Sequence, residues 1–312
     1  MRPATLDALV ERGLLILALS SIGILLLITV FIFREGGPLL FRVGIGNFLG
    51  TSWQPAEGQF GIATMVAGSA AVTVGALLLG VPLGLACAIV LAEMVSIRTR
   101  TILKPAIEVL AGIPSVVYGF IGIVVLIPWI RQNLGGAGAS VLAGSIILGI
   151  MVLPTVIGIS IDALQAVPKS YREGSIALGA TRWQTIRRVV LPAARSGIVA
   201  AVILGMGRAV GETMAVIMVA GNSVQIPHSP LDSVRTLTAN IALEMGYAAG
   251  DHRSALFATG VVLFVIIMAL NATANLARGW QRRRTVIRPP ISQATSADLG
   301  KTTRTIRDPE AC

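Results

Sequence analysis

The sequence has few charges and few of the residues on which most enzyme chemistry depends. Only 13% of its 312 residues are charged, and it has two histidines and two cysteines. A soluble domain of this length carries about 25% charged residues, so an ordinary cytosolic enzyme is excluded. Cys87 and Cys312 offer neither a disulfide framework nor metal-ligand spacing, and His228 and His252 are expected in solvated loops. With no Ser/His/Asp arrangement, metal motif or pair of catalytic carboxylates, we expect no enzyme activity, metal or cofactor in this chain.

Long apolar runs take up most of the chain. Hydrophobic residues make up 54% of it, and the mean hydropathy is +0.80. A helix that crosses a bilayer needs about 20 apolar residues, because the hydrocarbon core is about 30 Å thick. Six segments meet this requirement: residues 13–33, 61–91, 106–128, 140–161, 196–220 and 254–277. We therefore expect an all-α membrane protein with six transmembrane helices. The first is expected to stay as an uncleaved anchor, because Phe31 to Arg34 lack the small residues of a cleavage site.

The net charge of +10 indicates topology rather than binding to nucleic acid. Residues 1–12, 93–105, 162–195 and 278–312 hold 19 of the 25 lysines and arginines, whereas the three alternate gaps hold 5. Cytoplasmic loops carry the basic excess in membrane proteins, so both termini are expected in the cytoplasm. The basic residues would face lipid headgroups, and no nucleic-acid partner is expected.

These patterns divide the chain into three parts. Residues 1–60 are expected to form an anchor helix and an external loop, and residues 61–277 the transmembrane domain with a cytoplasmic loop at 162–195. Residues 278–312 form a basic, polar tail whose composition predicts disorder. The external segment 221–253 suits either a position on the outer membrane interface or contact with a substrate-binding protein.

Small residues and prolines mark special positions within the spans. Gly80 and Gly84, and likewise Gly207 and Gly211, recur at a spacing of four, which allows helix backbones to approach closely in lipid. The densest helix break is Gly112-Ile113-Pro114-Ser115. A break at membrane depth requires neighbouring protein or a water-filled cavity to satisfy the freed backbone groups. Both a buried kink and a role in lining a pathway fit Pro114 and Ser115.

The loop at 162–195 contains signals for two short helices. Ser170 to Glu173 and Thr181 to Gln184 each fit a capping box, which predicts a helix start. Gly179 stands where the first helix would end, and Pro192 follows the second. Tyr171, Trp183 and Ile186 would then be exposed just below the membrane. Such a helix pair suits either an interfacial anchor or a rigid knob that docks on a cytoplasmic partner.

A resemblance favours the docking interpretation. The stretch resembles the EAA loop of ABC importer permeases in its spacing throughout, at Glu173, Gly174, Ser175, Gly179, Val189, Leu191 and Pro192. Gly174 and Ser175 replace alanines of that pattern, and Val189 replaces isoleucine. The resemblance implies that the loop couples this chain to a dimer of partner ATPase subunits, which bind ATP and Mg²⁺ in its place.

Two ionisable residues lie inside the fifth apolar run, near its middle. An arginine at the bilayer centre costs about 2.5 to 3.5 kcal/mol, so Arg208 must face the bundle interior or a polar cavity. A spacing of four places Arg208 and Glu212 on one face of a helix. A structural ion pair is one interpretation, but ionisable groups within spans are functional by default. A guanidinium offers a fork of donors to an oxyanion, and this chemistry alone does not separate phosphate from sulfate.

A second resemblance narrows the substrate. Residues 110–120 (LAGIPSVVYGF) and 207–216 (GRAVGETMAV) resemble signature stretches of phosphate-specific ABC transporter permeases of the PstC type. The likeness runs from about residue 50 to 277. It implies a substrate pathway that includes Pro114, Ser115, Arg208, Glu212 and Thr213. It also implies a PstA-type second permease, a PstB-type ATPase dimer, an external PstS-type phosphate-binding protein and a bacterial inner membrane.

Two alternatives remain open at this stage. One keeps the ABC permease and changes the cargo to sulfate, molybdate or phosphonate. The other is an ion-coupled secondary transporter in which Arg208 and Glu212 form a proton relay, although no inverted repeat is evident.

Overall fold

The computed structural model describes residues 3–285, and the side chains of residues 10–273. Among the described residues, six helical segments are long and apolar enough to cross a membrane: Val10–Val43, Ala63–Met94, Ser115–Asn133, Val141–Gln165, Arg182–Gly211 and Gly250–Thr273. The all-α fold with six spans is therefore confirmed. The last helix extends to Thr285, so the predicted tail begins as helix, and residues 286–312, with Cys312, lie outside the described residues.

The first part of the chain forms a long helix, a hairpin and the first helix of the bundle. In order these elements are α1 (Pro3–Val43), α2 (Ile45–Phe48), β1 (Trp53–Gln54), η1 (Pro55–Glu57), β2 (Gln59–Phe60), α3 (Ala63–Ile89) and the π-helical turn η2 (Val90–Met94). The two strands pair antiparallel, with Trp53 opposite Phe60.

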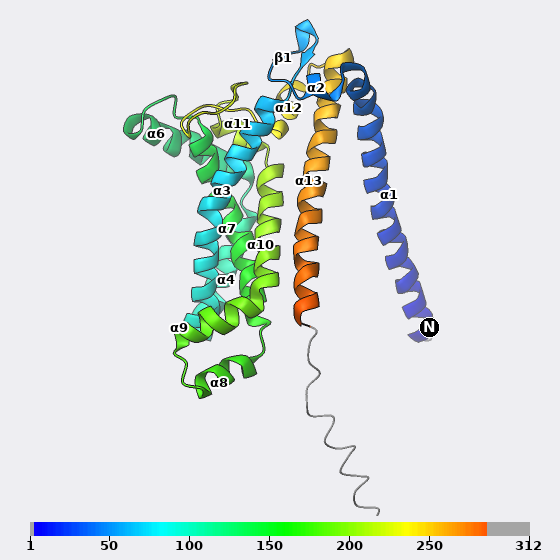
Figure 1. The fold of residues 1–312 in the computed structure, drawn as a ribbon. Coiled ribbons are helices and arrows are strands. Elements are labelled where there is room, and N and C mark those ends of the chain that lie inside the picture. The colour runs from blue at the N-terminus through cyan, green and yellow to red at the C-terminus, as the bar shows by residue number, and fades with distance from the viewer. Residues whose placement is uncertain (1–2, 286–312) are drawn as a thin grey trace, which may run out of the picture. The chain divides into compact units, whose positions relative to one another are not determined.

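The rest of the chain is helical, with two short helices in the loop between α7 and α10. The elements are α4 (Ile97–Gly112), α5 (Ser115–Ile121), η3 (Gly122–Leu126), α6 (Ile127–Asn133), α7 (Val141–Gln165), α8 (Lys169–Ala177), α9 (Arg182–Thr185), η4 (Ile186–Val190), α10 (Leu191–Gly211), α11 (Met214–Val219), α12 (Leu237–Glu244) and α13 (Gly250–Thr285). We call the end of the bundle with β1 and β2 the hairpin end, and the end with α8 and α9 the loop end (Figure 1).

Helix α7 is the centre of the bundle, with α3 and α10 packed along it (Figure 1). Glycine makes the closest of these contacts possible: a Cβ added at Gly80 would lie 2.8 Å from the carbonyl oxygen of Gly149, and one at Gly84 would lie 2.9 Å from Val156. The predicted packing role of Gly80 and Gly84 is therefore confirmed. Nothing lies within 4 Å of such a Cβ at Gly207 or Gly211, so that prediction is wrong for contacts within this chain.

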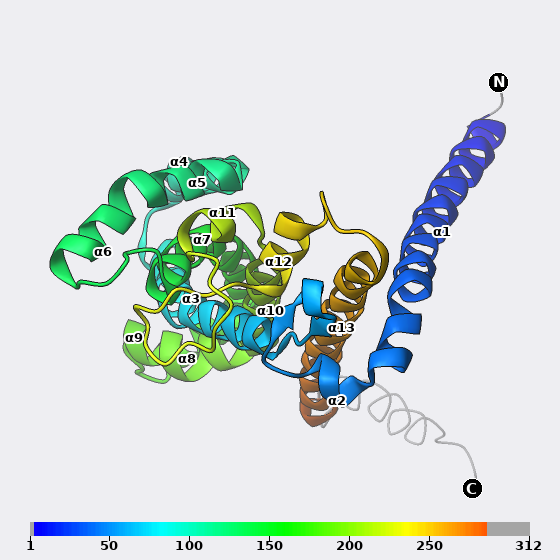
Figure 2. The ribbon, with the colours of Figure 1, turned by 90° about the horizontal axis from the view of Figure 1, so that it is seen from above.

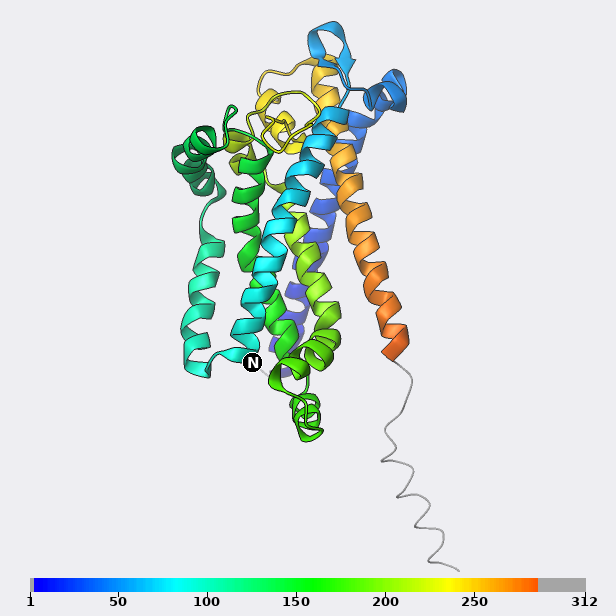
Figure 3. The same ribbon diagram turned by 60° about the vertical axis from the view of Figure 1, so that its left-hand side comes forward.

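Two of the predicted spans are broken helices. The third, expected over 106–128, is interrupted at Ile113 and Pro114, both with extended backbone, and Figure 3 shows the chain changing direction between α4 and α5. The fifth, expected over 196–220, ends at Gly211. Glu212 is extended, with φ −71° and ψ 130°, and α11 begins at Met214. Both breaks leave backbone groups that need other partners at membrane depth.

The hairpin end has a hydrophobic core of its own. Leu39, Phe48, Trp53, Phe60 and Leu256 are buried there together. Seen from above, α13 lies between α1 and the bundle (Figure 2). Edge-to-face aromatic pairs hold α1 against α13, with ring centroids 5.5 Å apart between Phe31 and Phe257 and 6.0 Å apart between Phe33 and Phe264. His252, expected in solvent, is mostly buried in this region.

Candidate functional site

The loop helices at the loop end begin differently from each other. Thr181 and Gln184 form the predicted capping box: the Thr181 N–H donates to Oε1 of Gln184 at 2.9 Å, and the Gln184 N–H donates to Oγ1 of Thr181 at 3.3 Å. The box predicted at Ser170 is wrong. Helix α8 begins two residues earlier, directly after Pro168, whose fixed φ suits the residue at a helix start.

Gly179 forms the predicted elbow between α8 and α9. Its φ is +83°, a left-handed conformation that only glycine adopts without strain. The Gly179 N–H donates to the Ile176 carbonyl at 2.9 Å, and the Ala180 N–H donates to the Ser175 carbonyl at 3.2 Å. This pair of bonds is a Schellman motif, which fixes the direction of the chain as it leaves α8.

Several apolar side chains of the two loop helices are exposed. Leu178 is 91% exposed, and Tyr171, Ile176 and Trp183 are each more than half exposed. Glu173, in the same loop, is exposed as well. Ile186 was expected here but is buried, because it faces the bundle. Exposed apolar groups gathered on an ordered surface mark an interaction site. We call these exposed residues of the loop, Tyr171, Glu173, Ile176, Leu178 and Trp183, the docking face.

Helix α9 continues without a break into α10. The helix expected to end before Pro192 instead passes through the π-helical turn η4, in which the Leu191 N–H donates to the Ile186 carbonyl. The wider turn accommodates Pro192, which lacks an N–H and would clash with the preceding turn of a regular helix. Leu191 and Pro192 therefore begin α10 within one continuous, span-length helical segment, Arg182–Gly211, that starts in the loop.

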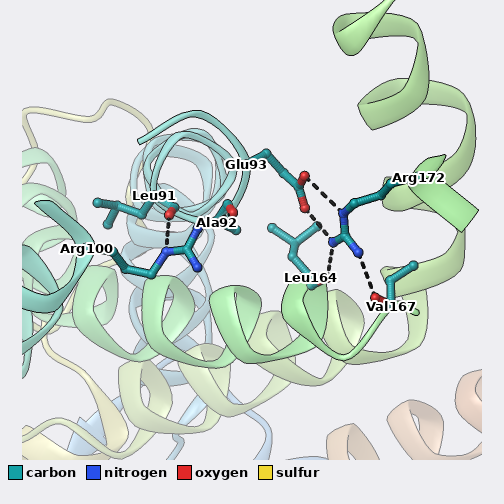
Figure 4. Close-up of polar contacts among 7 residues, drawn as sticks. All are labelled: Leu91, Ala92, Glu93, Arg100, Leu164, Val167 and Arg172. Atoms are coloured by element: carbon teal, nitrogen blue, oxygen red, sulfur yellow. Dashed lines mark hydrogen bonds and ion pairs between the residues drawn. The ribbon is translucent and has the colours of Figure 1, made fainter. Parts of the chain in front are cut away.

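Arg172 holds the loop to the bundle, and the sequence analysis did not single it out. Its side chain reaches from α8 to Glu93 in η2 and to the carbonyls of Leu164 and Val167 at the end of α7 (Figure 4). Arg172 and Glu93 are 79 residues apart, so no local pattern joins them. The one signal available was that Arg172 directly precedes Glu173.

Arg208 and Glu212 lie on either side of the break between α10 and α11. Arg208 is in the last turn of α10, not near the middle of a continuous helix, and it is exposed in the isolated chain. Glu212 follows the end of α10, and its carboxylate accepts a hydrogen bond from the Ala215 N–H at 3.2 Å. The expectation of one shared helix face is wrong. Among the side chains that the structure describes, Arg208 forms no ion pair.

A small cavity with several hydroxyl groups adjoins this break. Glu212 lines it together with Ser69, Thr73, Thr236 and Thr238. Oγ1 of Thr238 donates to the backbone carbonyl of Glu212 at 3.0 Å, which satisfies a carbonyl left free by the break. Hydroxyl groups thus lie beside Glu212 in a small cavity whose other lining residues are apolar.

The other predicted pathway residues lie near this region through the helices that follow the breaks. Thr213 lies at the start of α11, and its Oγ1 donates to the Gly211 carbonyl at 3.4 Å. Pro114 and Ser115 begin α5, and α5 packs against α11: a Cβ added at Gly119 would lie 2.6 Å from Sδ of Met218. The structure therefore joins the two broken spans, but it does not pair the two charges.

Six span-length helices, a docking face at one end and charges at a helix break together define a multi-pass membrane protein of the transport class. Its fold is that of ABC importer permeases. A bacterial ABC transporter involved in the import of the acidic polysaccharide alginate matches 90% of this chain and 99% of its own, with a TM-score of 0.59 and 16% identity. An inward-facing MetNI methionine ABC transporter matches 73% of this chain and 98% of its own, with a TM-score of 0.54 and 20% identity.

Comparison of sequences gives the family. Residues 80–287 match the family described as binding-protein-dependent transport system inner membrane component, and the chain belongs to this family. A probable ABC transporter permease protein, YqgH of Bacillus subtilis, is 45% identical over 257 residues, 80% of this chain and 83% of its own. The phosphate transport system permease protein PstC of Xylella fastidiosa is 35% identical over 253 residues, which are 75% of this chain and 78% of its own. PstC of Mesorhizobium japonicum is 35% identical over 269 residues, which are 80% of this chain and 82% of its own.

Proposed function

We propose that this chain is the permease subunit of an ATP-driven, binding-protein-dependent importer of inorganic phosphate. Its family and its PstC relatives support this function. The observation that carries it is Arg208, a guanidinium at the end of an apolar span-length helix with no carboxylate partner among the described side chains. Such a group offers several donors to an oxyanion in a site of low dielectric constant, where charge-assisted hydrogen bonds are strong.

In the proposed assembly, different partner proteins bind the two ends of the bundle. A PstB-type ATPase dimer would bind the docking face and would carry ATP and Mg²⁺, while this chain hydrolyses nothing. A PstA-type permease would complete the pathway, and a PstS-type protein would deliver phosphate at the hairpin end. The distribution of basic residues supports a bacterial inner membrane with both termini and the docking face in the cytoplasm.

The mechanism proposed is alternating access driven from the docking face. Closure of the ATPase dimer would move α8 and α9, and α10 begins directly where α9 and η4 end. Movement of α10 would change which side of the membrane Arg208 faces. Pro114, Ser115 and Thr213 would line the pathway at the two breaks, and Glu212 would hold the polar cavity beside it.

The test compares two arginine variants in cells that lack the native chain. Uptake of labelled phosphate and of labelled sulfate is measured in parallel, with Arg208→Ala and with Arg98→Ala, an exposed arginine at the loop end, as the matched control. Loss of hydrogen bonds to a charged ligand costs about 1.5 to 3 kcal/mol, so we expect Arg208→Ala to reduce phosphate uptake at least about tenfold. Arg98→Ala should transport normally at equal protein levels.

The other outcomes separate the alternatives. Normal phosphate uptake by Arg208→Ala would contradict the role of this residue. Loss of sulfate uptake in place of phosphate uptake would keep the ABC permease and change its cargo. A proton relay has less support than before, because Arg208 and Glu212 do not share a helix face. It would require uptake to stop on addition of an uncoupler while ATP is held constant.

A further inference from the structure

Arg172 connects the loop to two transmembrane helices through four hydrogen bonds (Figure 4). Its Nη2 and Nε donate to the two carboxylate oxygens of Glu93, at 2.7 and 3.2 Å. Its Nη1 donates to the Val167 carbonyl at 2.7 Å, and Nη2 donates also to the Leu164 carbonyl at 2.8 Å. One side chain of α8 thus binds η2, the turn that continues α3, through Glu93, and also the last turn of α7 and the residues just after it.

The geometry of this contact requires arginine. Two parallel donors match the two oxygens of a carboxylate, while the third nitrogen reaches a carbonyl on the other side, which the single ammonium of lysine cannot reproduce. The Arg172 and Glu93 side chains are 22% and 10% exposed, so solvent screens the pair weakly. Lys104 and Asp162 form an ion pair at the same end of the bundle, but they are 36% and 65% exposed and join α4 to α7 without contacting α8.

The turn η2, which continues α3 and carries Glu93, is itself held firmly. Arg100 of α4 donates from Nε to the Leu91 carbonyl at 2.7 Å and from Nη2 to the Ala92 carbonyl. Further along, α3 packs against α7 at backbone distance through Gly80 and Gly149. A displacement of Arg172 therefore acts on a pair of helices that move together rather than on a loose chain end.

We propose that Arg172 is a positioning residue that transmits movement of the docking face to α3 and α7, with Glu93 as its anchor. The inference rests on the proposed function, since it assigns a mechanical role within the same importer. Arg172 contacts neither phosphate nor ATP in this role. It acts between the docking face, which α8 and α9 carry, and the ends of the two helical segments that Arg172 contacts.

The experiment uses the complete importer with its partner subunits, reconstituted in vesicles with the external binding protein. For each variant we measure the amount of assembled complex, ATP hydrolysis, and phosphate imported per ATP hydrolysed. Arg172→Gln should leave assembly and ATP hydrolysis close to wild type, because the docking face is unchanged. It should lower phosphate imported per ATP about tenfold, equivalent to about 1.4 kcal/mol of lost coupling.

Three further variants distinguish coupling from a general loss of structure. Lys104→Gln, the matched control, should keep the wild-type ratio of phosphate to ATP. Arg172→Lys should give a ratio of phosphate to ATP between those of wild type and Arg172→Gln, because it keeps the charge but loses the two parallel donors. It replaces Arg172→Gln in the experiment where that variant fails to assemble. Glu93→Gln should also lower the ratio, and combining it with Arg172→Gln should add little, because both act through one contact.

The outcomes overturn different statements. An unchanged ratio of phosphate to ATP in Arg172→Gln, or in Arg172→Lys where the glutamine variant fails to assemble, would overturn the role of Arg172 alone. Additive effects of the Glu93 and Arg172 variants would do the same. A wild-type complex that imports no phosphate would overturn the proposed function, and the inference with it.

Discussion

The Glu244 carboxylate joins three segments at the hairpin end, and its replacement should strongly lower the local stability there. Its Oε2 accepts hydrogen bonds from Nε1 of Trp53 in the hairpin, at 2.9 Å, and from Nε2 of His252 in α13, at 2.8 Å. Its Oε1 accepts one from Nη1 of Arg235 at 2.6 Å. The Glu244 side chain is only 9% exposed and that of Arg235 is 19% exposed. Because water reaches them little, each charge is balanced mainly by the other.

The expected cost follows from this burial. Breaking a buried ion pair by changing one partner costs about 3 to 5 kcal/mol, because the other charge stays behind without compensation. Glu244→Gln keeps the shape and one acceptor oxygen, so we expect about 3 kcal/mol, at the lower end of that range. Asp251→Asn is the matched control. Asp251 pairs with Arg42 at 3.0 Å at the same end, but the two side chains are 59% and 62% exposed. Such a surface pair contributes about 0 to 1 kcal/mol.

The assay is amide hydrogen exchange of the full chain in lipid nanodiscs. A loss of about 3 kcal/mol in Glu244→Gln should speed exchange about 150-fold for amides of residues 53–62 and of α12, if these open as one unit. Asp251→Asn should change these rates severalfold at most, and neither variant should affect α8. Equal, small effects of the two variants would refute the argument that burial of this network determines its strength.

Further predictions concern single residues of the two ends. Thr181→Ala removes the cap of α9 and should cost about 1 kcal/mol of local stability, measured as faster exchange of the first amides of α9. Gly179→Ala forces a side chain into φ +83°, at a cost of about 1 to 2 kcal/mol, and should weaken copurification of the ATPase. Gly174→Ala, where a Cβ meets nothing within 4 Å, should leave ATPase copurification unchanged. The backbone N–H groups of His228 and Ser229 lower the pKa of Asp232 below its usual 3.8, so the stability that this carboxylate gives its loop is complete above that value and is lost as the pH falls through the lowered pKa. The ¹³C chemical shift of the Asp232 carboxylate should therefore stay constant down to about pH 4 and change only in stronger acid.

Local signals in the sequence predict the local structure well. The six spans follow from the length of their apolar runs, and the elbow at Gly179 follows from a residue that tolerates positive φ between two helical patterns. The start of α9 at Thr181 was predicted because its cap uses side chains three residues apart. Ser170 carried an equally good pattern and failed, because Pro168 already supplies the start of α8.

Features that depend on residues distant in sequence could not be predicted. The contact of Arg172 with Glu93 needs the ends of α3 and α7 to lie side by side, which only the packed bundle provides. The break at Glu212 has no proline to mark it. It is stabilised by partners elsewhere, including the hydroxyl of Thr238, 26 residues further along the chain. A single continuous apolar run was the simplest interpretation without those partners.

The break explains why Arg208 and Glu212 need not pair with each other. A helix carries partial negative charge at its C-terminus and partial positive charge at its N-terminus. Arg208 lies in the last turn of α10, and the Glu212 carboxylate accepts a hydrogen bond at the start of α11, so each backbone end stabilises the charge beside it. The guanidinium therefore does not need the Glu212 carboxylate to balance its charge, and among the described side chains no carboxylate occupies its donors. The same helix begins at Arg182 on the loop and runs unbroken to Gly211, which gives the docking face a direct connection to Arg208.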